Sequence, residues 1–151
     1  MTDPSRDDEV LADRAAITAL VYRYAELLDT GDLAAVAELF AHATWRSEAT
    51  GEVRRGIAEV SEVYDRVRLY GGTPRTKHLI TNLVIDMAPD GRSATARCSF
   101  TVLQGVEPGE PIQAVLSGRY LDRFEKPDGR WRFSDRQFVV DLVGDLRRHF
   151  G

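Results

Sequence analysis

The spacing of apolar residues changes once along the chain, close to Pro74, and this change is the strongest constraint on the fold. Before Pro74, apolar residues recur every three or four positions, which is typical of amphipathic helices. After Pro74 they alternate with polar residues, which is typical of strands that bury one face. Helices that come first and strands that follow predict an α+β architecture, with the helices packed on one face of a sheet.

Three helices are predicted in the first half, over residues 10–30, 33–40 and 57–67, with a short strand over 44–49. Asp32 stands where a residue that caps the second helix is expected. The apolar stripe of the first helix consists of Ile17, Leu20, Val21, Tyr24, Leu27 and Leu28.

Four long strands follow, over residues 77–87, 94–102, 112–124 and 131–139, and turn sequences containing Pro and Gly separate them. Because they exceed the usual length of ~5–6 residues, the sheet must twist and curl. A curled sheet covered by helices on one side encloses a concave interior.

The chain of 151 residues predicts one domain over residues 10–151, preceded by a polar, flexible tail over residues 1–9. No signal peptide and no membrane-spanning stretch is recognised. The lone Cys98 excludes an internal disulfide, which suits the cytoplasm. We therefore expect a cytoplasmic protein that does not interact with membranes.

Composition and motifs also argue against nucleic acid, metal ions and cofactors. The net charge is −4 and the 20 basic residues are scattered, so a phosphate backbone is a poor partner. His42, His78 and His149 show no metal-ligand spacing, and HExxH and CxxC motifs are missing. Glycine-rich nucleotide-binding motifs and GxSxG are missing as well. We expect no metal and no cofactor.

Asp29 and His78 are candidates for a catalytic pair. Asp29 follows the buried stripe of the first helix, and a carboxylate facing the interior needs a partner. His78 shares strand parity with Ile80, Asn82 and Val84. If that row faces the hollow, the carboxylate accepts the imidazole Nδ1–H, and the other ring nitrogen is a general base. The alternative is an Asp–His pair that only ties the helix to the sheet.

Three stretches carry a resemblance to a known family: RAAITALVYRYAELLDTGD, TKHLITNLVI and GRYLDRFEKPDGRWRFSDR. In this order they resemble the SnoaL-like group of the NTF2-like superfamily, which includes scytalone dehydratase, polyketide cyclases and a dehydrochlorinase. The resemblance covers roughly residues 10–140. It implies a cone-shaped, curved sheet, antiparallel or mixed, with three N-terminal helices on its concave side. It also implies catalytic roles for Asp29 and His78.

The resemblance also assigns substrate-binding positions. Tyr120 matches a substrate-binding asparagine of the dehydratase, and Glu48 falls near one of its pocket tyrosines. The dehydratase's second catalytic histidine would fall near Leu103 or Gln104, where this sequence has no histidine. The sequence therefore departs from the pattern of scytalone dehydration.

The remaining candidates each have two interpretations. Tyr24 and Tyr64 are either phenols that donate to a substrate oxygen or core aromatics. Asn82 and Gln104 either orient a substrate or bond to each other or to water. Glu48 is either a pocket charge or part of an exposed pair at a strand end.

The first long strand has apolar residues on both faces, which predicts a covering subunit and hence a homodimer or homotrimer. The C-terminal sequence DLVGDLRRHF is expected to cover the pocket mouth or a neighbouring subunit. We expect a cofactor-free proton-transfer enzyme, a lyase or dehydratase, an isomerase or a cyclase, acting on a small, largely apolar polyketide-, steroid- or terpenoid-like molecule. The alternative is a non-catalytic module that binds small molecules or assembles as an oxygenase small subunit does.

Overall fold

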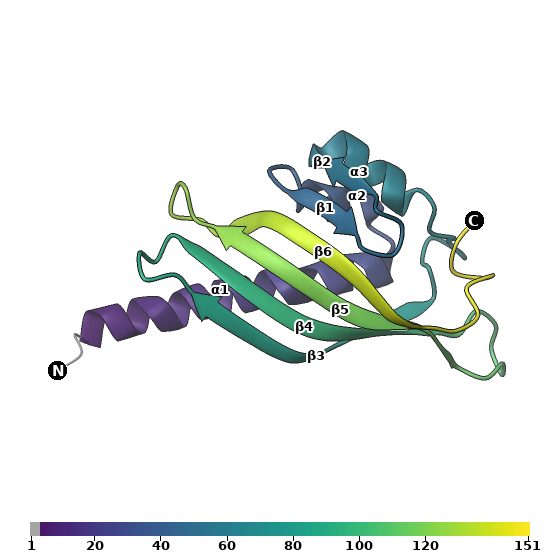
Figure 1. The fold of residues 1–151 in the computed structure, drawn as a ribbon. Coiled ribbons are helices and arrows are strands. Elements are labelled where there is room, and N and C mark those ends of the chain that lie inside the picture. The colour runs from purple at the N-terminus through teal and green to yellow at the C-terminus, as the bar shows by residue number, and fades with distance from the viewer. Residues whose placement is uncertain (1–3) are drawn as a thin grey trace.

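A six-stranded sheet, curved around one long helix, organises the chain (Figure 1). The computed structural model describes residues 4–151. Its elements are α1 (Pro4–Thr30), α2 (Leu33–Glu38), β1 (Thr44–Ser47), β2 (Val53–Arg55), α3 (Gly56–Tyr64), β3 (Thr76–Met87), β4 (Ser93–Gln104), β5 (Gln113–Glu125) and β6 (Arg132–Val143). The predicted α+β class and the order of helices before long strands are confirmed.

The strand order is β2-β1-β6-β5-β4-β3. Strands β3 to β6 form an antiparallel meander, whereas β1 pairs with β6 in parallel, so the sheet is mixed. The sheet is not closed, and β3 forms one edge, next to α1. Figure 1 shows α1 crossing one side of the sheet, with α2 and α3 beyond β1. This arrangement places the end of α1 beside the start of β3.

Helix α1 begins at Pro4, six residues before the expected start. The tail predicted over residues 1–9 is therefore helical from residue 4, and its first three positions lie outside the described residues. Asp7 in the first turn stabilises the positive end of the helix dipole, which favours this extension. At the other end Gly31, with φ of 80°, lets the chain turn into α2. A Cβ there would lie 2.0 Å from the carbonyl oxygen of Gly72.

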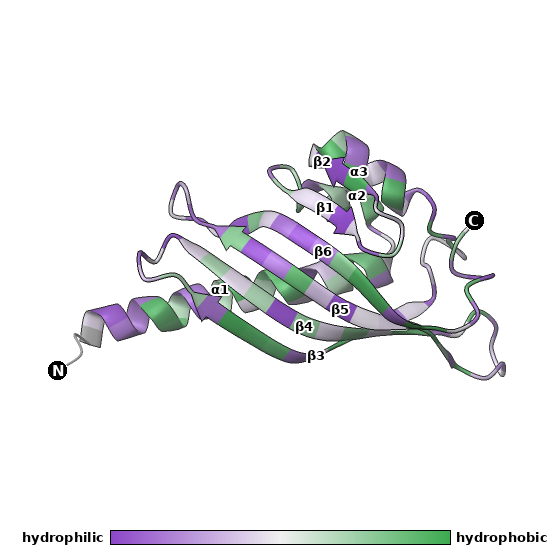
Figure 2. Cartoon of the chain, viewed as in Figure 1, coloured by the Kyte–Doolittle hydropathy of each residue, from purple (hydrophilic) through white to green (hydrophobic). Residues whose placement is uncertain are grey.

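A β-bulge in β3 changes which residues face the helices. The register with β4 shifts between Thr81 and Val84, and Asn82 adopts a positive φ of 54°. His78 and Ile80 lie on the inner face, but beyond the bulge the buried position is Ile85. Asn82 is exposed, so its predicted place on the inner row with His78 is wrong. Figure 2 shows apolar stretches along β3.

Candidate functional site

Asp29 and His78 meet at the junction of α1 and β3. The Nδ1 atom of His78 lies 2.6 Å from Oδ1 of Asp29, and Oδ2 of the same carboxylate accepts the backbone N–H of His78 at 2.9 Å. Thr76 donates its hydroxyl to Oδ1 at 2.9 Å. The side chains of His78 and Asp29 are only 6% and 12% exposed. The juxtaposition predicted from sequence is therefore present in the structure.

The carboxylate of Asp29 is held in its ionised form. Burial alone would raise the pKa of Asp29, but hydrogen bonds from His78 and Thr76, and the charge that His78 can carry, lower it below its ordinary value. An ionised carboxylate only accepts hydrogen bonds, so Nδ1 of His78 carries the proton and donates it. This tautomer leaves Nε2 of His78 with a free lone pair, which is what a general base requires.

Thr76 was not singled out in the sequence, although a signal for it was present. It lies two positions before His78, so both side chains point to the same face of β3. A hydroxyl in that position reaches the acid that the imidazole also contacts.

A groove with a volume of about 610 Å³ runs beside this pair. Residues 22–30 of α1 form one wall and residues 77–81 of β3 form the other. Ala25, Leu79 and Ile80 supply apolar surface, and both Asp29 and His78 line the groove. It lies between α1 and the free edge of β3, whereas the sequence predicted a pocket inside the curved sheet.

Aromatic side chains occupy the interior of the sheet instead. Tyr24, Tyr64 and Tyr120 are at most 5% exposed. The Tyr64 hydroxyl donates to that of Tyr24 at 3.0 Å, and the ring of Tyr120 stacks on Phe100 at 4.4 Å. Burial raises the pKa of all three phenols. Gly118, two residues before Tyr120, lies against the Phe100 ring and the backbone of Val139. The three tyrosines are thus part of a packed core.

A buried ion pair in this core was missed in the sequence. Arg136 donates to both carboxylate oxygens of Asp122, at 2.7 and 2.8 Å, and both side chains are at most 1% exposed. The guanidinium lies over the rings of Tyr24 and Tyr120, 4.2 and 4.0 Å from their centroids. Burial raises the pKa of Asp122, and the charge of Arg136 partly offsets this. Asp122 shares the parity of Tyr120, which was the available signal.

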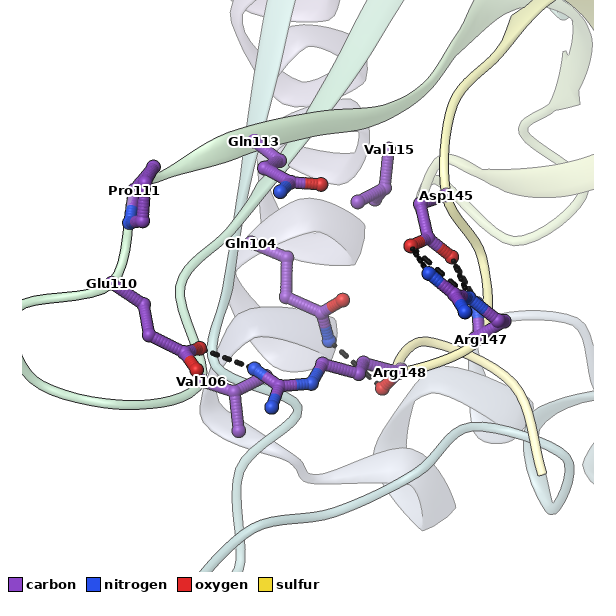
Figure 3. A pocket seen from close by; sticks show the side chains of 9 residues that line it. All are labelled: Gln104, Val106, Glu110, Pro111, Gln113, Val115, Asp145, Arg147 and Arg148. Atoms are coloured by element: carbon purple, nitrogen blue, oxygen red, sulfur yellow. Dashed lines mark hydrogen bonds and ion pairs between the residues drawn. The ribbon is translucent and has the colours of Figure 1, made fainter.

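Two other predicted substrate-binding residues, Glu48 and Gln104, do not line the groove beside Asp29 and His78. Glu48 is exposed, and Arg46 pairs with Asp135, so the predicted pocket role of Glu48 finds no support. Gln104 is buried and donates from Nε2 to the carbonyl oxygens of Pro74 and Arg148, at 3.0 and 3.1 Å. Figure 3 shows Gln104 at the wall of a second cavity of about 360 Å³, between the ends of β4 and β5 and the C-terminal segment.

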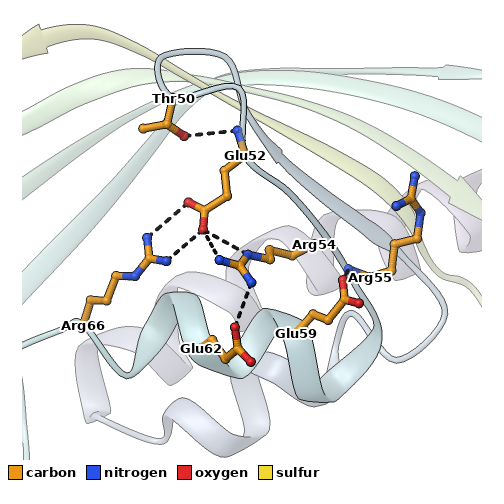
Figure 4. Close-up of polar contacts among 7 residues, drawn as sticks. All are labelled: Thr50, Glu52, Arg54, Arg55, Glu59, Glu62 and Arg66. Carbon is orange, nitrogen blue, oxygen red and sulfur yellow. Dashed lines mark hydrogen bonds and ion pairs between the residues drawn. The ribbon is translucent and has the colours of Figure 1, made fainter.

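A charged cluster stands apart from the Asp29–His78 pair (Figure 4). Glu52 accepts from Arg54 and Arg66, and Arg54 also donates to Glu62 at 2.7 Å. The hydrogen bonds from the two guanidinium groups lower the pKa of Glu52 to about 2. The cluster joins β2 to α3 and the segment after it, which is a structural role.

Residues 4–151 contain neither a metal-binding cluster nor a membrane-spanning helix. In that part of the chain no group of three or more His, Cys, Asp or Glu residues is placed to bind a metal ion. None of the helices described there is both long and apolar enough to cross a membrane.

Comparison with known proteins identifies the family of the chain and supports its fold. The model of the SnoaL-like domain family matches residues 9–137. A putative scytalone dehydratase from Novosphingobium aromaticivorans superposes with a TM-score of 0.73 at 22% identity, covering 92% of this chain and 91% of the other. A hexachlorocyclohexane dehydrochlorinase superposes with a TM-score of 0.74 at 20% identity, and 91% of each chain is covered.

The same fold occurs in the β subunit of a putative aromatic-ring-hydroxylating dioxygenase from Novosphingobium aromaticivorans, with a TM-score of 0.72 at 18% identity and coverage of 93% and 97%. Among curated proteins none matches the chain closely. At such identities these likenesses establish the cone-shaped fold, which hosts both enzymes and an oxygenase subunit.

Proposed function

Because the chain belongs to the SnoaL-like domain family, we propose that it is a cofactor-free enzyme that transfers protons on a small, largely apolar molecule. His78 is the base and Asp29 is its partner. The reaction class is that of a lyase or dehydratase, an isomerase or a cyclase, and the substrate is polyketide-, steroid- or terpenoid-like. The single observation that carries this proposal is the buried hydrogen bond between His78 and Asp29 beside a groove.

In the proposed mechanism, Nε2 of His78 removes a proton from carbon or oxygen of a molecule bound in the groove. The imidazolium that forms is stabilised by Asp29, which lies 2.6 Å from Nδ1 and is already ionised. A positioned base of this kind typically contributes ~10²–10⁴-fold to a rate. Ala25, Leu79 and Ile80 give the groove an apolar surface against which an apolar substrate could pack, while polar residues such as Glu26 and Lys77 line it as well.

The experiment measures deuterium uptake from D2O next to the carbonyl group of three ketones: tetralone, androstenedione and carvone. These represent aromatic polyketide, steroid and terpenoid substrates. We expect the wild-type protein to catalyse exchange into at least one ketone, and His78→Gln to reduce the rate by about 100-fold. His42→Gln is the matched control, because His42 is exposed and away from the groove. Equal rates for wild type and His78→Gln on all three ketones would refute the proposal.

A non-catalytic module is the second candidate, and the packed interior favours it. Tyr24, Tyr120 and Arg136 fill the space that a ligand inside the sheet would need. Like the dioxygenase β subunit, such a protein would use the fold for assembly. If folded wild-type protein shows no exchange that depends on His78, this candidate replaces the enzyme.

A further inference from the structure

The free edge of β3 presents backbone groups to the groove beside Asp29 and His78. On its other side β3 pairs with β4, where the backbone N–H of Gly105 donates to the carbonyl oxygen of Arg75 at 3.1 Å, so odd-numbered positions before the bulge face β4. In an antiparallel ladder the positions between them point away from the partner strand. His78 follows this rule, because its N–H donates to Asp29. The N–H of Ile80, two positions on, therefore points the same way.

The N–H of Ile80 has no acceptor within residues 4–151. Outside the β-ladder, no hydrogen bond of that part of the chain involves the backbone of Ile80. Residues 77–81 line the groove, and their two edge-facing N–H groups are those of His78 and Ile80. The first is already bonded to Asp29. The N–H of Ile80 is thus the backbone donor of this stretch that is left for a bound molecule.

Helix α1 leaves this donor uncovered, because a small residue stands opposite it. Arg14 donates to the carbonyl oxygen of Ile85 at 2.8 Å, whereas Asp29 bonds at the start of β3, so helix and strand run in opposite directions. Four helical residues back from Asp29 span ~6 Å, and two strand residues past that contact span ~6.6 Å. Ala25 therefore lies opposite Ile80, and both line the groove. A methyl group at this place leaves room for a ligand atom beside the N–H.

The imidazole of His78 lies at the same edge of β3 as this N–H. One carboxylate, that of Asp29, holds both the ring and the outward N–H of His78, at 2.6 and 2.9 Å. Nε2 of His78 has no partner in the described part of the chain and is not sealed from solvent. Along the strand His78 and Ile80 are ~6.6 Å apart, and an acidic carbon with its neighbouring carbonyl oxygen bridges that span with a contact of ~3 Å at each end.

We propose that the backbone N–H of Ile80 donates to the carbonyl oxygen of a ketone-like molecule while Nε2 of His78 removes a proton from the adjacent carbon. The C–H electron pair becomes the C=C bond of an enolate, the carbonyl π pair moves to the oxygen, and the proton goes to Nε2. The hydrogen bond from Ile80 strengthens as this oxygen becomes negative. The inference rests on the proposed function and narrows its substrates to molecules with a hydrogen next to a carbonyl group.

Side-chain donors in the groove are less well placed for this role. The hydroxyl of Thr30 donates to carbonyl oxygens of α1 at 3.0 and 3.1 Å. Lys77 and Thr81 share the parity of the outer face of β3 and are exposed. The phenol of Tyr22 is the remaining alternative, and the experiments below distinguish it from Ile80.

A first experiment tests the free N–H without turnover, by amide hydrogen exchange and NMR on the wild type. We expect the Ile80 amide to exchange at least about 10-fold faster than the amides of Leu79 and Thr81, which face β4. Naphthol, estrone and carvacrol are phenols that mimic the enols of tetralone, androstenedione and carvone. At least one should shift the Ile80 amide resonance downfield and slow its exchange. An Ile80 amide as protected as its neighbours, or one that none of the three phenols shifts, would overturn the inference.

A second experiment tests the role, using deuterium uptake by the three ketones. Ile80→Pro removes the N–H, and an edge strand tolerates proline where the N–H faces away from the sheet. Ile80→Val keeps the N–H and a β-branched side chain, so it is the matched control. We expect Ile80→Pro to lose about 100-fold in exchange rate and Ile80→Val to retain most of it. If Ile80→Pro unfolds, an ester in place of the amide of Ile80 removes the same N–H and keeps the side chain.

The outcomes separate the two proposals. Uptake that depends on His78 but is equally fast in the folded variant without the Ile80 N–H refutes the role of Ile80 alone. A loss in Tyr22→Phe without a loss in that variant assigns the donor to the phenol and overturns the inference as well. The absence of any uptake dependent on His78 refutes the proposed function and, with it, the role of Ile80.

Discussion

Asp29 holds His78 twice, once through the ring Nδ1 and once through the backbone N–H. The end of α1 is therefore tied both to the side chain and to the main chain at the start of β3. Because two oxygens of one carboxylate fix the ring and its backbone together, the imidazole cannot rotate about χ1 without breaking a charge-assisted hydrogen bond. Such a ring is oriented before a ligand arrives, which is what general base catalysis needs.

Replacement of Asp29 by Asn tests this relationship. The amide keeps the size of the side chain but loses its charge, so it stabilises the imidazolium less and also permits the other tautomer of His78. We expect about 100-fold slower ketone exchange with little change in folding, measured by NMR and by circular dichroism. Thr76→Val removes one hydrogen bond to Asp29 and leaves the His78–Asp29 bond in place, so it serves as the matched control. Full activity in Asp29→Asn contradicts a catalytic role for the pair.

The pKa of His149 predicts a dependence of stability on pH. Its folded-state value of about 4 lies below the ordinary value of 6.5, so the unfolded chain binds more protons between these two values. The contribution of His149 is fully present above pH 6.5 and declines as the pH falls toward 4. Between pH 7 and pH 5 we expect the free energy of unfolding to fall by up to about 2 kcal/mol. Urea titrations should show a smaller fall in His149→Asn, and an equal fall would contradict the burial of a neutral ring.

The local part of the site could be predicted from sequence, because it depends on two short-range patterns. The helical stripe placed Asp29 at the end of α1, and alternation placed His78 on the inner face of β3. Alternation of apolar and polar residues does not reveal the bulge at Asn82. Because one inserted residue reverses the parity of all residues after it, the faces assigned beyond Asn82 could not be predicted either.

The docking of His149 was also beyond sequence patterns. Residues 145–151 have no regular period, and their position depends on backbone contacts with Arg68 and Gln104, which lie far away in the sequence. The ion pair of Asp122 and Arg136 had a weak signal in strand parity. The fact that the interior is filled rather than hollow follows from how several aromatic rings pack together, which no single position reveals.

The buried pair of Asp122 and Arg136 predicts a strong asymmetry between single and double variants. Arg136→Met leaves the Asp122 carboxylate buried without its partner, and we expect a loss of about 3–5 kcal/mol in the free energy of unfolding. Replacing both residues, as Asp122→Leu with Arg136→Met, removes both desolvation costs and should be less destabilising than Arg136→Met alone. Urea titration measures both variants. A double variant that is less stable than Arg136→Met would contradict the unpaired buried carboxylate as the cause of the loss.

The outer face of β3 predicts self-association. Leu79 and Val84 are 46% and 38% exposed, and apolar side chains on an edge strand favour contact with another chain. We propose that a second copy covers this face, and expect sedimentation to show a dimer or trimer that Val84→Lys shifts toward the monomer. Ala49→Lys, at an exposed position in the turn between β1 and β2, at the opposite edge of the sheet, is the control. A wild-type protein that sediments as a monomer would contradict the covering subunit.

Gly118 predicts a large effect of a single methyl group. A Cβ at this position would lie 1.9 Å from the carbonyl oxygen of Val139 and 3.0 Å from the Phe100 ring. Because the backbone of β6 would have to move, Gly118→Ala should destabilise the protein by about 3 kcal/mol. Gly105→Ala is the matched control, since its nearest neighbour is a side-chain atom of Ile112 at 3.5 Å, an ordinary contact. Thermal melting compares the two variants. Equal melting temperatures would mean that β5 and β6 are less closely packed around Phe100 than the structure shows.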